Sequence, residues 1–477
     1  MFTSDLQEKY VPFFTETLSA FGGEIRGKSR YVLRKNIGSP FPESGAYFGC
    51  ISDAEDPSGP YSDLSIVVFP SNENNATDDR WIIALGVGSL GYKNDYHLAS
   101  IPGTRRLFAK HLGKDSFIKT DFLDIESQIG FSGFCDKNDI PVTLNNAVKN
   151  YGKVLLVCSL LDPNDYEQSQ TVIRSYLAIY SLLRDWPNKA QKKSIDKVLS
   201  KRIDVIDEKE EIMELLKLRR YLVLQGAPGT GKTRMAKGLV VDTPKENVFF
   251  TQFHAETSYS DFVYGIIPNT EANELKYSER KGVFVKAIEK ANEVLQHDST
   301  EKVFLIIDEI NRANLSNVLG TAFYLFEPTM GDSNIEIEVC PGLSLAKLPD
   351  NLYVIATMNT ADRSLAVVDF ALRRRFAWYT MYPKAIQADS GMHFCNDEYR
   401  AIADIFERYA TDEELNLQPG QAYFIVSEDH AEYQMKNRMK YEIMPLIKEY
   451  LADGLLSRAK DEFVNYFRQR VNEELYK

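Results

Sequence analysis

Short apolar runs separated by polar turns alternate along this chain with longer stretches whose apolar residues have helical spacing. From residue 221 onward, the apolar runs are rich in β-branched and aromatic residues, which predicts strands. The predicted strands are residues 221–225, 247–253, 303–308, 352–357 and 376–382. Strands that alternate with helices in this way predict a parallel sheet covered on both faces, hence an α/β core. After Pro383 the pattern is helical, as in residues 399–409 and 444–451, which predicts a small C-terminal α-helical domain.

The first part of the chain predicts a separate α+β domain. Residues 65–70 (SIVVFP), 81–87 (WIIALGV) and 154–159 (VLLVCS) have the pattern of strands, and residues 172–184 have helical spacing. The predicted organisation is an N-terminal recognition or partner domain (1–188), a linker with leading helices (189–220), an α/β core (221–383) and a helical lid (384–477).

Composition excludes several classes of protein. Hydrophobic residues make up 44% of the chain, enough for ordinary globular cores. No apolar run reaches the ~18 residues that a membrane span needs, and the N-terminus does not have the pattern of a signal peptide, so we expect a cytoplasmic protein. The net charge of -12 is not that of an obligate nucleic-acid binder, although a local basic patch stays compatible with it. The five cysteines are scattered without a CxxC pair, which argues against disulfides or a zinc site.

Residues 226–233 (GAPGTGKT) match the phosphate-binding pattern GxxxxGK[ST] between a predicted strand and a predicted helix. The glycines let backbone N–H groups curl around phosphate oxygens, and the following helix N-terminus adds its positive dipole end. Lys232 is expected to reach the β- and γ-phosphates, and the Thr233 hydroxyl to ligate Mg²⁺. The predicted nucleotide-binding residues are Gly226, Ala227, Pro228, Gly229, Thr230, Gly231, Lys232 and Thr233.

Two later strands end in polar residues that suit phosphate hydrolysis. Residues 303–309 (VFLIIDE) end in two carboxylates, of which Asp308 suits Mg²⁺ coordination and Glu309 suits a general base acting on water. Residues 352–359 (LYVIATMN) end in Asn359, which would hold the same water. An ordinary strand end or turn is the alternative for each, and the preceding phosphate loop favours the catalytic interpretation.

Together, residues 308–314 (DEINRAN), 358–364 (MNTADRS) and 371–376 (ALRRRF) resemble the McrB family, the NTPase subunits of modification-dependent restriction systems. Three further segments fit the same family: residues 250–265 (FTQFHAETSYSDFVYG), 418–424 (QPGQAYF) and 441–450 (YEIMPLIKEY). The resemblance covers about residues 221–451, and MNTADRS is its most specific motif. It implies an AAA+ P-loop NTPase core with a parallel sheet and a C-terminal α-helical lid.

The resemblance also implies a ring, usually a hexamer, with nucleotide bound between subunits. Asn359 would be the sensor, and Asp362 and Arg363 would belong to a signature loop at the interface.

An arginine finger acting in trans is expected among Arg373, Arg374 and Arg375, with Arg374 preferred and Arg375 next. Packing on the sheet edge is the alternative for each of the three. Arg438 is a candidate second sensor, for which a solvated surface arginine is the favoured alternative.

The function implied is that of the motor subunit of a DNA restriction complex in antiviral defence. Mg²⁺ and GTP are implied by the family, and ATP stays open because the phosphate loop does not distinguish purines. No PD…(D/E)xK nuclease pattern is visible, so cleavage is expected from a separate McrC-like subunit. A MoxR-like ATPase that remodels protein partners is the alternative, and the N-terminal domain could equally be a protein-docking or small-ligand module.

DNA contact by the N-terminal domain rests on a stretch in which basic and aromatic residues alternate. A helix with a solvated basic face and buried phenylalanines is the favoured alternative. The residues concerned are Arg105, Arg106, Phe108, Lys110, Lys114, Phe117, Lys119 and Phe122. Tyr47, Phe48, Trp81 and Tyr92 could line a pocket, with core packing as the default. Residues 261–282 and 331–348 could be insertions or ordinary surface loops.

Overall fold

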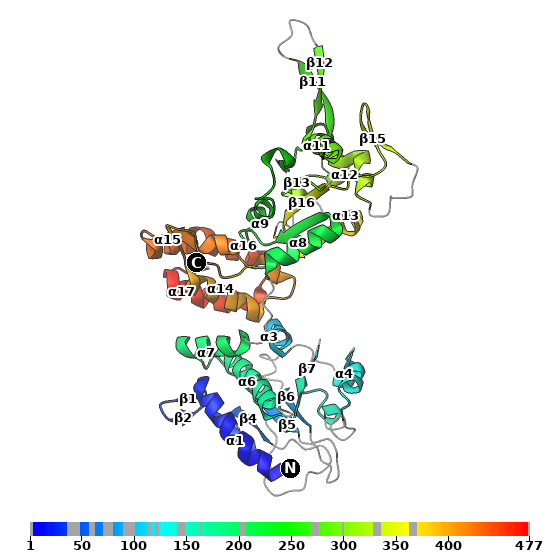
Figure 1. Ribbon diagram of the computed structural model, residues 1–477. Helices are drawn as coiled ribbons and strands as arrows, with labels where there is room; N and C mark the ends of the chain where they lie inside the picture. Colours follow the sequence, from blue (N-terminus) through cyan, green and yellow to red (C-terminus); the bar gives the residue numbers. More distant parts are fainter. Residues whose placement is uncertain are drawn as a thin grey trace. The chain divides into compact units, whose positions relative to one another are not determined.

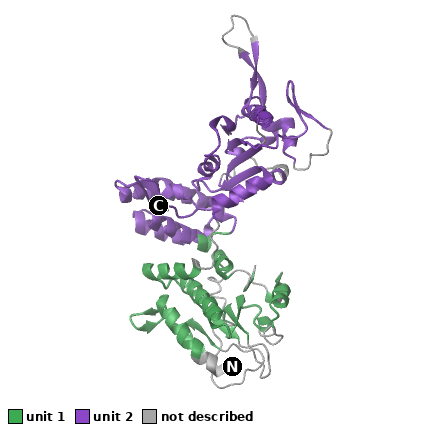
Figure 2. Cartoon of the chain, in the orientation of Figure 1, with its two compact units in different colours: residues 1–205, 407–411 green, residues 206–406, 412–477 purple. Residues whose placement is uncertain are grey.

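The computed structural model describes residues 3–35, 48–56, 63–69, 80–88, 101–112, 116–119, 124–128, 130–140, 148–162, 164–200, 207–269, 276–297, 300–327, 335–361 and 370–475. The chain divides into two compact units (Figure 2). Unit 1 consists of residues 1–205 and 407–411, and unit 2 consists of residues 206–406 and 412–477.

Unit 1 is built on a six-stranded antiparallel sheet in the order β3-β4-β5-β6-β8-β7. The strands of this sheet are β3 (Tyr31–Lys35), β4 (Phe48–Ser52), β5 (Leu64–Phe69), β6 (Trp81–Val87), β7 (Ser116–Ile118) and β8 (Leu155–Leu161). A separate two-stranded sheet is formed by β1 (Glu24–Ile25) and β2 (Lys28–Ser29). Its helices are α1 (Thr3–Ala20), α3 (Pro102–Leu112), α4 (Phe131–Lys137), α6 (Tyr166–Leu183) and α7 (Lys189–Ser200). The expected α+β architecture is confirmed.

The two faces of this sheet carry different helices, because side chains alternate between the faces along each strand. In β6, Ile83 and Leu85 lie in the core shared with α1, α3 and α6. Their neighbours Ile82 and Ala84 belong to a second core, which includes Phe131 of α4. The sheet is therefore buried on both sides, which explains why the sequence of β6 is apolar throughout.

Unit 2 contains a five-stranded parallel sheet in the order β10-β13-β16-β9-β17. Its strands are β9 (Tyr221–Gly226), β10 (Val248–Gln252), β13 (Val303–Asp308), β16 (Leu352–Asn359) and β17 (Ala377–Thr380). The α/β helices are α8 (Glu208–Arg219), α9 (Lys232–Leu239), α10 (Tyr259–Phe262), α11 (Val283–His297), α12 (Leu315–Leu319) and α13 (Phe370–Arg375). Each of the five predicted strands is present, and the predicted parallel sheet is confirmed.

Helices cover both faces of this sheet, as the strand–helix alternation predicts (Figure 1). Along β9, Leu222 and Leu224 pack in one core with α8 and α9. The alternate positions Tyr221 and Val223 pack in the other core, which contains α11 and α12. The phosphate loop follows directly from this buried central strand.

The remaining elements of unit 2 are helical or short hairpins. The C-terminal helices are α14 (Asn396–Tyr409), α15 (Ala431–Arg438), α16 (Met444–Ala452) and α17 (Lys460–Val471), with the strands β18 (Met392–Phe394) and β19 (Ile425–Ser427). The two segments predicted as insertions or loops contain antiparallel hairpins: β11 (Tyr264–Asn269) with β12 (Lys276–Lys281), and β14 (Ile337–Cys340) with β15 (Leu343–Leu345).

The segment predicted as a linker, residues 189–220, divides between the units. In α7, Ile195 and Leu199 are buried in the core of unit 1. In α8, Ile212 and Leu216 are buried against the parallel sheet of unit 2. Charged residues outnumber apolar ones in both helices, because each helix buries only a narrow stripe of apolar side chains. The sequence therefore gives little sign that these helices pack against a core.

Candidate nucleotide-binding site

The phosphate loop connects β9 to α9 with backbone that favours glycine. Gly229 and Gly231 have φ angles of 80° and 86°, which side-chain-bearing residues rarely adopt. Gly231 is the N-cap of α9, so Lys232 and Thr233 form the first turn of that helix. This is the strand–loop–helix context that the sequence motif requires.

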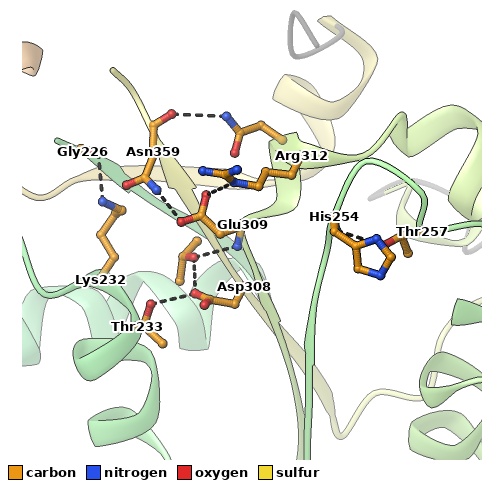
Figure 3. Close-up of polar contacts among 11 residues, drawn as sticks. Gly226, Lys232, Thr233, His254, Thr257, Asp308, Glu309, Arg312 and Asn359 are labelled. Atoms are coloured by element: carbon orange, nitrogen blue, oxygen red, sulfur yellow. Dashed lines mark hydrogen bonds and ion pairs between the residues drawn. The ribbon is translucent and has the colours of Figure 1, made fainter. Parts of the chain in front are cut away.

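Lys232 is buried, at 6% exposed, and its ammonium group lies across its own loop. Its Nζ donates a hydrogen bond to the carbonyl oxygen of Gly226 at 3.0 Å (Figure 3). It also donates to the carbonyl oxygen of Ala227 at 2.8 Å. A buried ammonium is stable only where acceptors surround it. The lysine ammonium group therefore lies against the carbonyl groups of the loop that is predicted to bind phosphates.

The predicted magnesium residues lie in direct contact. Thr233 Oγ1 donates a hydrogen bond to Asp308 Oδ1 at 2.7 Å, although 75 residues separate them in the chain. Thr357 Oγ1 donates to the same Asp308 oxygen at 2.6 Å. Asp308 ends β13 and Thr357 lies near the end of β16, and the carboxyl ends of parallel strands meet at one edge of a sheet, where ligands of α/β folds bind.

Glu309 follows Asp308 in a left-handed backbone conformation, with φ 56°. Its N–H donates to Thr357 Oγ1 at 3.1 Å. Its carboxylate accepts hydrogen bonds from Asn359 Nδ2 and, at 3.4 Å, from Arg312 Nε (Figure 3). Non-glycine residues in this region of backbone space are uncommon and concentrate at functional sites.

Asn359 makes a second hydrogen bond, in which its backbone carbonyl oxygen accepts from Asn311 Nδ2 at 3.2 Å. Because the Asn359 amide also donates to the Glu309 carboxylate, the predicted base and the predicted sensor are adjacent side chains.

The residues fit a hydrated Mg²⁺ ion by their donor chemistry. Asp308 is 8% exposed and presents a carboxylate beside the Thr233 hydroxyl, and such oxygen donors are the ones this ion prefers. Among the described residues, no group of three or more His, Cys, Asp or Glu side chains is arranged to hold a metal ion. The five cysteines are buried thiols: Cys50, Cys135, Cys158, Cys340 and Cys395. Burial raises the pKa of the Cys50 thiol to about 12, which makes it a poor ligand.

A loop from the helical region, residues 418–424, closes over the phosphate loop. The N–H groups of Gly420 and Ala422 donate to the carbonyl oxygens of Pro228 and Gly229, both at 3.0 Å. Gln421 Nε2 donates to the Thr230 carbonyl at 2.7 Å. These bonds connect the predicted lid to the nucleotide-binding loop over about 190 residues of sequence.

The three consecutive arginines have different environments. Arg375 is 4% exposed, pairs with Glu327 at 2.7 Å, and stacks over the ring of Phe323. Arg374 also reaches Glu327, at 3.0 Å, but its side chain is 64% exposed. Arg373 lies over the ring of Trp378. Packing on the sheet edge therefore describes Arg375 best, and exposure favours Arg374 as a residue that can reach another subunit.

Other predicted residues fall outside or beside this site. Asp362 and Arg363 lie outside the described residues. Arg438 donates to the Ala422 carbonyl oxygen at 3.0 Å, so it supports the lid loop.

In unit 1 the structure favours core packing over DNA contact for the phenylalanines of the segment in which basic and aromatic residues alternate. Phe108 and Phe117 are buried in core clusters. Lys119 is buried and donates to the Gly152 carbonyl oxygen at 2.9 Å. Phe48 and Trp81 are core residues as well. Tyr47, Tyr92, Lys114 and Phe122 lie outside the described residues.

Four residues of the site were not predicted as part of it: Asn311, Arg312, Thr357 and Gln421. Thr357 had a signal, because positions 357 and 359 share one face of a strand and so point to the same edge region. Arg312 lies three residues after Glu309, and Asn311 lies two residues after it, within the DEINRAN segment. Gln421 carried no local signal of a contact with the phosphate loop.

Comparison with known proteins identifies the same region. Residues 221–376 match the AAA domain of the dynein-related subfamily. The "Type IV methyl-directed restriction enzyme EcoKMcrB subunit" of Escherichia coli (strain K12) is 38% identical over 181 residues, covering 36% of this chain and 38% of that protein. The "Type II restriction enzyme BsuMI component YdiS" of Bacillus subtilis (strain 168) is 27% identical over 215 residues, covering 36% of this chain and 62% of that protein.

Both alignments therefore span less than two thirds of the relatives' own length. Among the helices of the described ranges, none has the length and apolarity needed to cross a membrane. The NTPase core matches in sequence, carries the phosphate loop on a parallel sheet and places both carboxylates beside it. Residues 221–376 are therefore an AAA domain, and part of the chain is similar to the McrB subunit of a restriction enzyme.

Proposed function

We propose that this chain is the motor subunit of a McrBC-like restriction complex, hydrolysing GTP or ATP in a ring of identical subunits. The observation that carries the proposal is the hydrogen-bonded set of Thr233, Asp308, Thr357, Glu309 and Asn359 at the edge of the parallel sheet. The names of its two relatives, both components of restriction enzymes, support the setting.

In this proposal the phosphate loop and Lys232 bind the β- and γ-phosphates. Thr233 and Asp308 hold Mg²⁺, which would neutralise charge on the phosphates. Glu309 takes a proton from the attacking water, and Asn359, hydrogen-bonded to the same carboxylate, orients that water. General-base catalysis of this kind contributes about 10²–10⁴-fold to a rate.

The charge that develops on the transferred phosphoryl group would be stabilised further by a cation supplied in trans, in addition to Lys232 and Mg²⁺. We assign that role to Arg374 from a neighbouring subunit, because its exposed side chain can leave Glu327 at little cost. Arg363, with Asp362, would contribute to the same interface.

The remaining parts of the proposal concern partners. The ring, most simply a hexamer, would bind a separate McrC-like endonuclease, and unit 1 would recognise DNA. Hydrolysis would then drive movement along DNA while the nuclease cleaves.

The test of the chemistry is Lys232→Ala, measured as release of inorganic phosphate from GTP and from ATP with Mg²⁺. We expect turnover of both nucleotides to fall by at least 10²-fold, because the buried ammonium is the loop's only side-chain cation. Lys237→Ala, an exposed lysine at the end of α9, is the matched control and should keep normal turnover. Phosphate release by Lys232→Ala at the rate of the unaltered protein would contradict the proposed NTPase activity.

The role in a restriction complex is tested by measuring whether a McrC-like nuclease stimulates the NTPase activity. Complex formation is measured by light scattering, and DNA binding of the full-length chain is measured as a function of salt concentration. Absence of both stimulation and complex contradicts the restriction assignment. Binding of a protein client without DNA binding would favour the MoxR-like alternative.

A further inference from the structure

A cavity of about 320 Å³ lies in unit 1 and shares no residue with the candidate site on the phosphate loop. Three segments form its wall: the β1–β2 hairpin, the end of β4 and the chain just after α6. Its volume is in the range of small-molecule sites. A double helix is instead contacted over a broad surface, so the cavity suits a small ligand better than duplex DNA.

The hairpin places an apolar and a cationic side chain side by side on this wall. Its turn consists of Arg26 and Gly27, whose φ angles are 52° and 76°. Two-residue turns with positive φ match the twist of a hairpin, so the register of the two strands is well defined. Ile25 and Lys28 are direct partners across the strands, and both line the cavity.

A buried ion pair fixes the opposite part of the wall. Arg184, which lines the cavity, pairs with Asp63, and that carboxylate is only 1% exposed. Arg184 Nη2 also donates to the carbonyl oxygen of Leu64 at 2.9 Å, and the N–H of Ser52 donates to Asp63. The charge of Arg184 is therefore balanced within the protein.

Two further cations leave the cavity with an excess of positive charge. Arg30 Nη1 donates to the carbonyl oxygens of Gly22, at 3.4 Å, and Trp186, at 3.3 Å, which hold its guanidinium group without neutralising it. Lys28 and Arg30 thus face a single further carboxylate on the wall, that of Asp53. Guanidinium and ammonium groups are the usual partners of phosphate, so the wall suits a phosphate-bearing ligand.

An aromatic residue of the wall suits the second part of such a ligand. Trp186 lines the cavity, and its indole ring packs edge-on against the ring of Tyr180, with centroids 5.4 Å apart. The ring of Tyr31 lies 6.4 Å from the indole centroid. These contacts hold the indole in place, and a tryptophan held in this way offers a flat apolar surface to a planar ring.

We propose that this cavity binds a small ribonucleotide, with its phosphate on Lys28 and Arg30 and its base against Trp186 beside Ile25. The Asp53 carboxylate, which has only acceptors, takes hydrogen bonds from the ribose hydroxyls. The inference goes beyond the proposed NTPase function, which assigns no nucleotide to unit 1.

The test is calorimetric titration of the full-length chain with each of the four ribonucleoside 5′-monophosphates. We expect at least one of them to bind with one site per chain. Its nucleoside, which lacks the phosphate, should bind at least tenfold more weakly, because a hydrogen bond to a charged group is typically worth about 1.5–3 kcal/mol. The 2′-deoxy form should bind at least threefold more weakly, since it lacks one of the hydroxyls that donate to Asp53.

The variant Lys28→Gln removes one of the two phosphate-binding cations from an exposed position of the hairpin. We expect it to weaken binding of the monophosphate at least tenfold. Arg26→Gln removes a charge from the turn of the same hairpin, outside the wall of the cavity, and should bind within twofold of the unaltered chain. Thermal unfolding of both variants checks that they fold.

Four outcomes overturn the proposal. They are no binding of any of the four monophosphates at millimolar concentrations, equal affinity for a monophosphate and its nucleoside, affinity of Lys28→Gln within twofold of the unaltered chain, and tighter, Lys28-dependent binding of a single-stranded oligonucleotide. The nucleoside comparison needs no variant and so does not depend on the folding of Lys28→Gln.

The variant Lys232→Ala separates this site from the phosphate loop. We expect it to bind the monophosphate as tightly as the unaltered chain, and loss of binding would assign the nucleotide to the loop and overturn the proposal. Failure of the cavity proposal remains distinct from failure of the NTPase proposal, because phosphate release from GTP and ATP is measured separately.

Discussion

At the residue scale, the Thr357 hydroxyl connects the two carboxylate residues of the site. It donates to Asp308 Oδ1 at 2.6 Å and accepts from the N–H of Glu309 at 3.1 Å. One buried side chain thus orients the proposed magnesium residue and holds the left-handed backbone that carries the proposed base.

Thr357→Val keeps the shape of this side chain and removes both hydrogen bonds. We expect the free energy of unfolding to fall by about 1–3 kcal/mol, because a buried N–H loses its acceptor and a buried carboxylate loses a donor. Turnover should fall as well, as Asp308 and Glu309 lose their alignment. Thermal unfolding and phosphate release are the measurements. Thr357→Ser should restore both properties, and a valine variant as stable and active as the unaltered protein would contradict the assigned role.

At the scale of elements, the loop of residues 418–424 closes on the phosphate loop with no room for an added side chain. A Cβ atom at Gly420 would lie 2.1 Å from the carbonyl carbon of Gly229 and 2.3 Å from the nitrogen of Thr230. Backbone lies on both sides of this contact, so rotation of a side chain cannot relieve it.

Gly420→Ala is therefore expected to push the two loops apart and break the Gly420 N–H to Pro228 bond. Nucleotide affinity should fall by about tenfold, equivalent to about 1.4 kcal/mol, in a titration with fluorescent nucleotide. Gly133→Ala, in α4, meets nothing within 4 Å and is the matched control. An unaltered affinity in Gly420→Ala would show that the lid loop moves away without consequence for the nucleotide.

At the scale of the whole molecule, the proposed ring would complete each catalytic site with Arg374 of a second subunit. Glu309→Gln retains Arg374 but lacks the proposed base, and Arg374→Ala retains the proposed base but lacks the proposed finger. Each variant alone should be inactive, while an equimolar mixture forms some sites with both groups. We expect the mixture to recover measurable phosphate release, and a mixture no more active than its components would rule out action of Arg374 in trans.

Arg375 is unsuitable for that experiment. It is buried against Glu327 and Phe323, and removing one partner of a buried ion pair typically costs about 3–5 kcal/mol. Loss of activity in Arg375→Ala would therefore report on folding, and the mixture is informative only with the exposed Arg374.

Local sequence patterns predicted much of the fold correctly, and they named most of the residues that the structure brings together at the candidate site. The phosphate loop is contiguous, its glycines have the positive φ angles that the tight turn requires, and its lysine and threonine begin the following helix. The ends of β13 and β16 were predicted from apolar runs, and parallel pairing then necessarily brings Asp308 and Asn359 to one edge. The apolar pattern and the motifs thus determined the α/β core and the position of the candidate site, because both depend on short-range order along the chain.

Contacts between distant segments were decided only by the tertiary structure. Glu208 and Lys384 meet over 176 residues, and Gln421 reaches Thr230 over 191. Arg374 and Arg375 are indistinguishable in sequence, yet one is exposed and the other is buried against Glu327. Residues 189–220 divide between two cores for the same reason. Burial and pairing of this kind depend on which surfaces the folded elements bring together. The residues next to each position in the chain give no information about these long-range contacts.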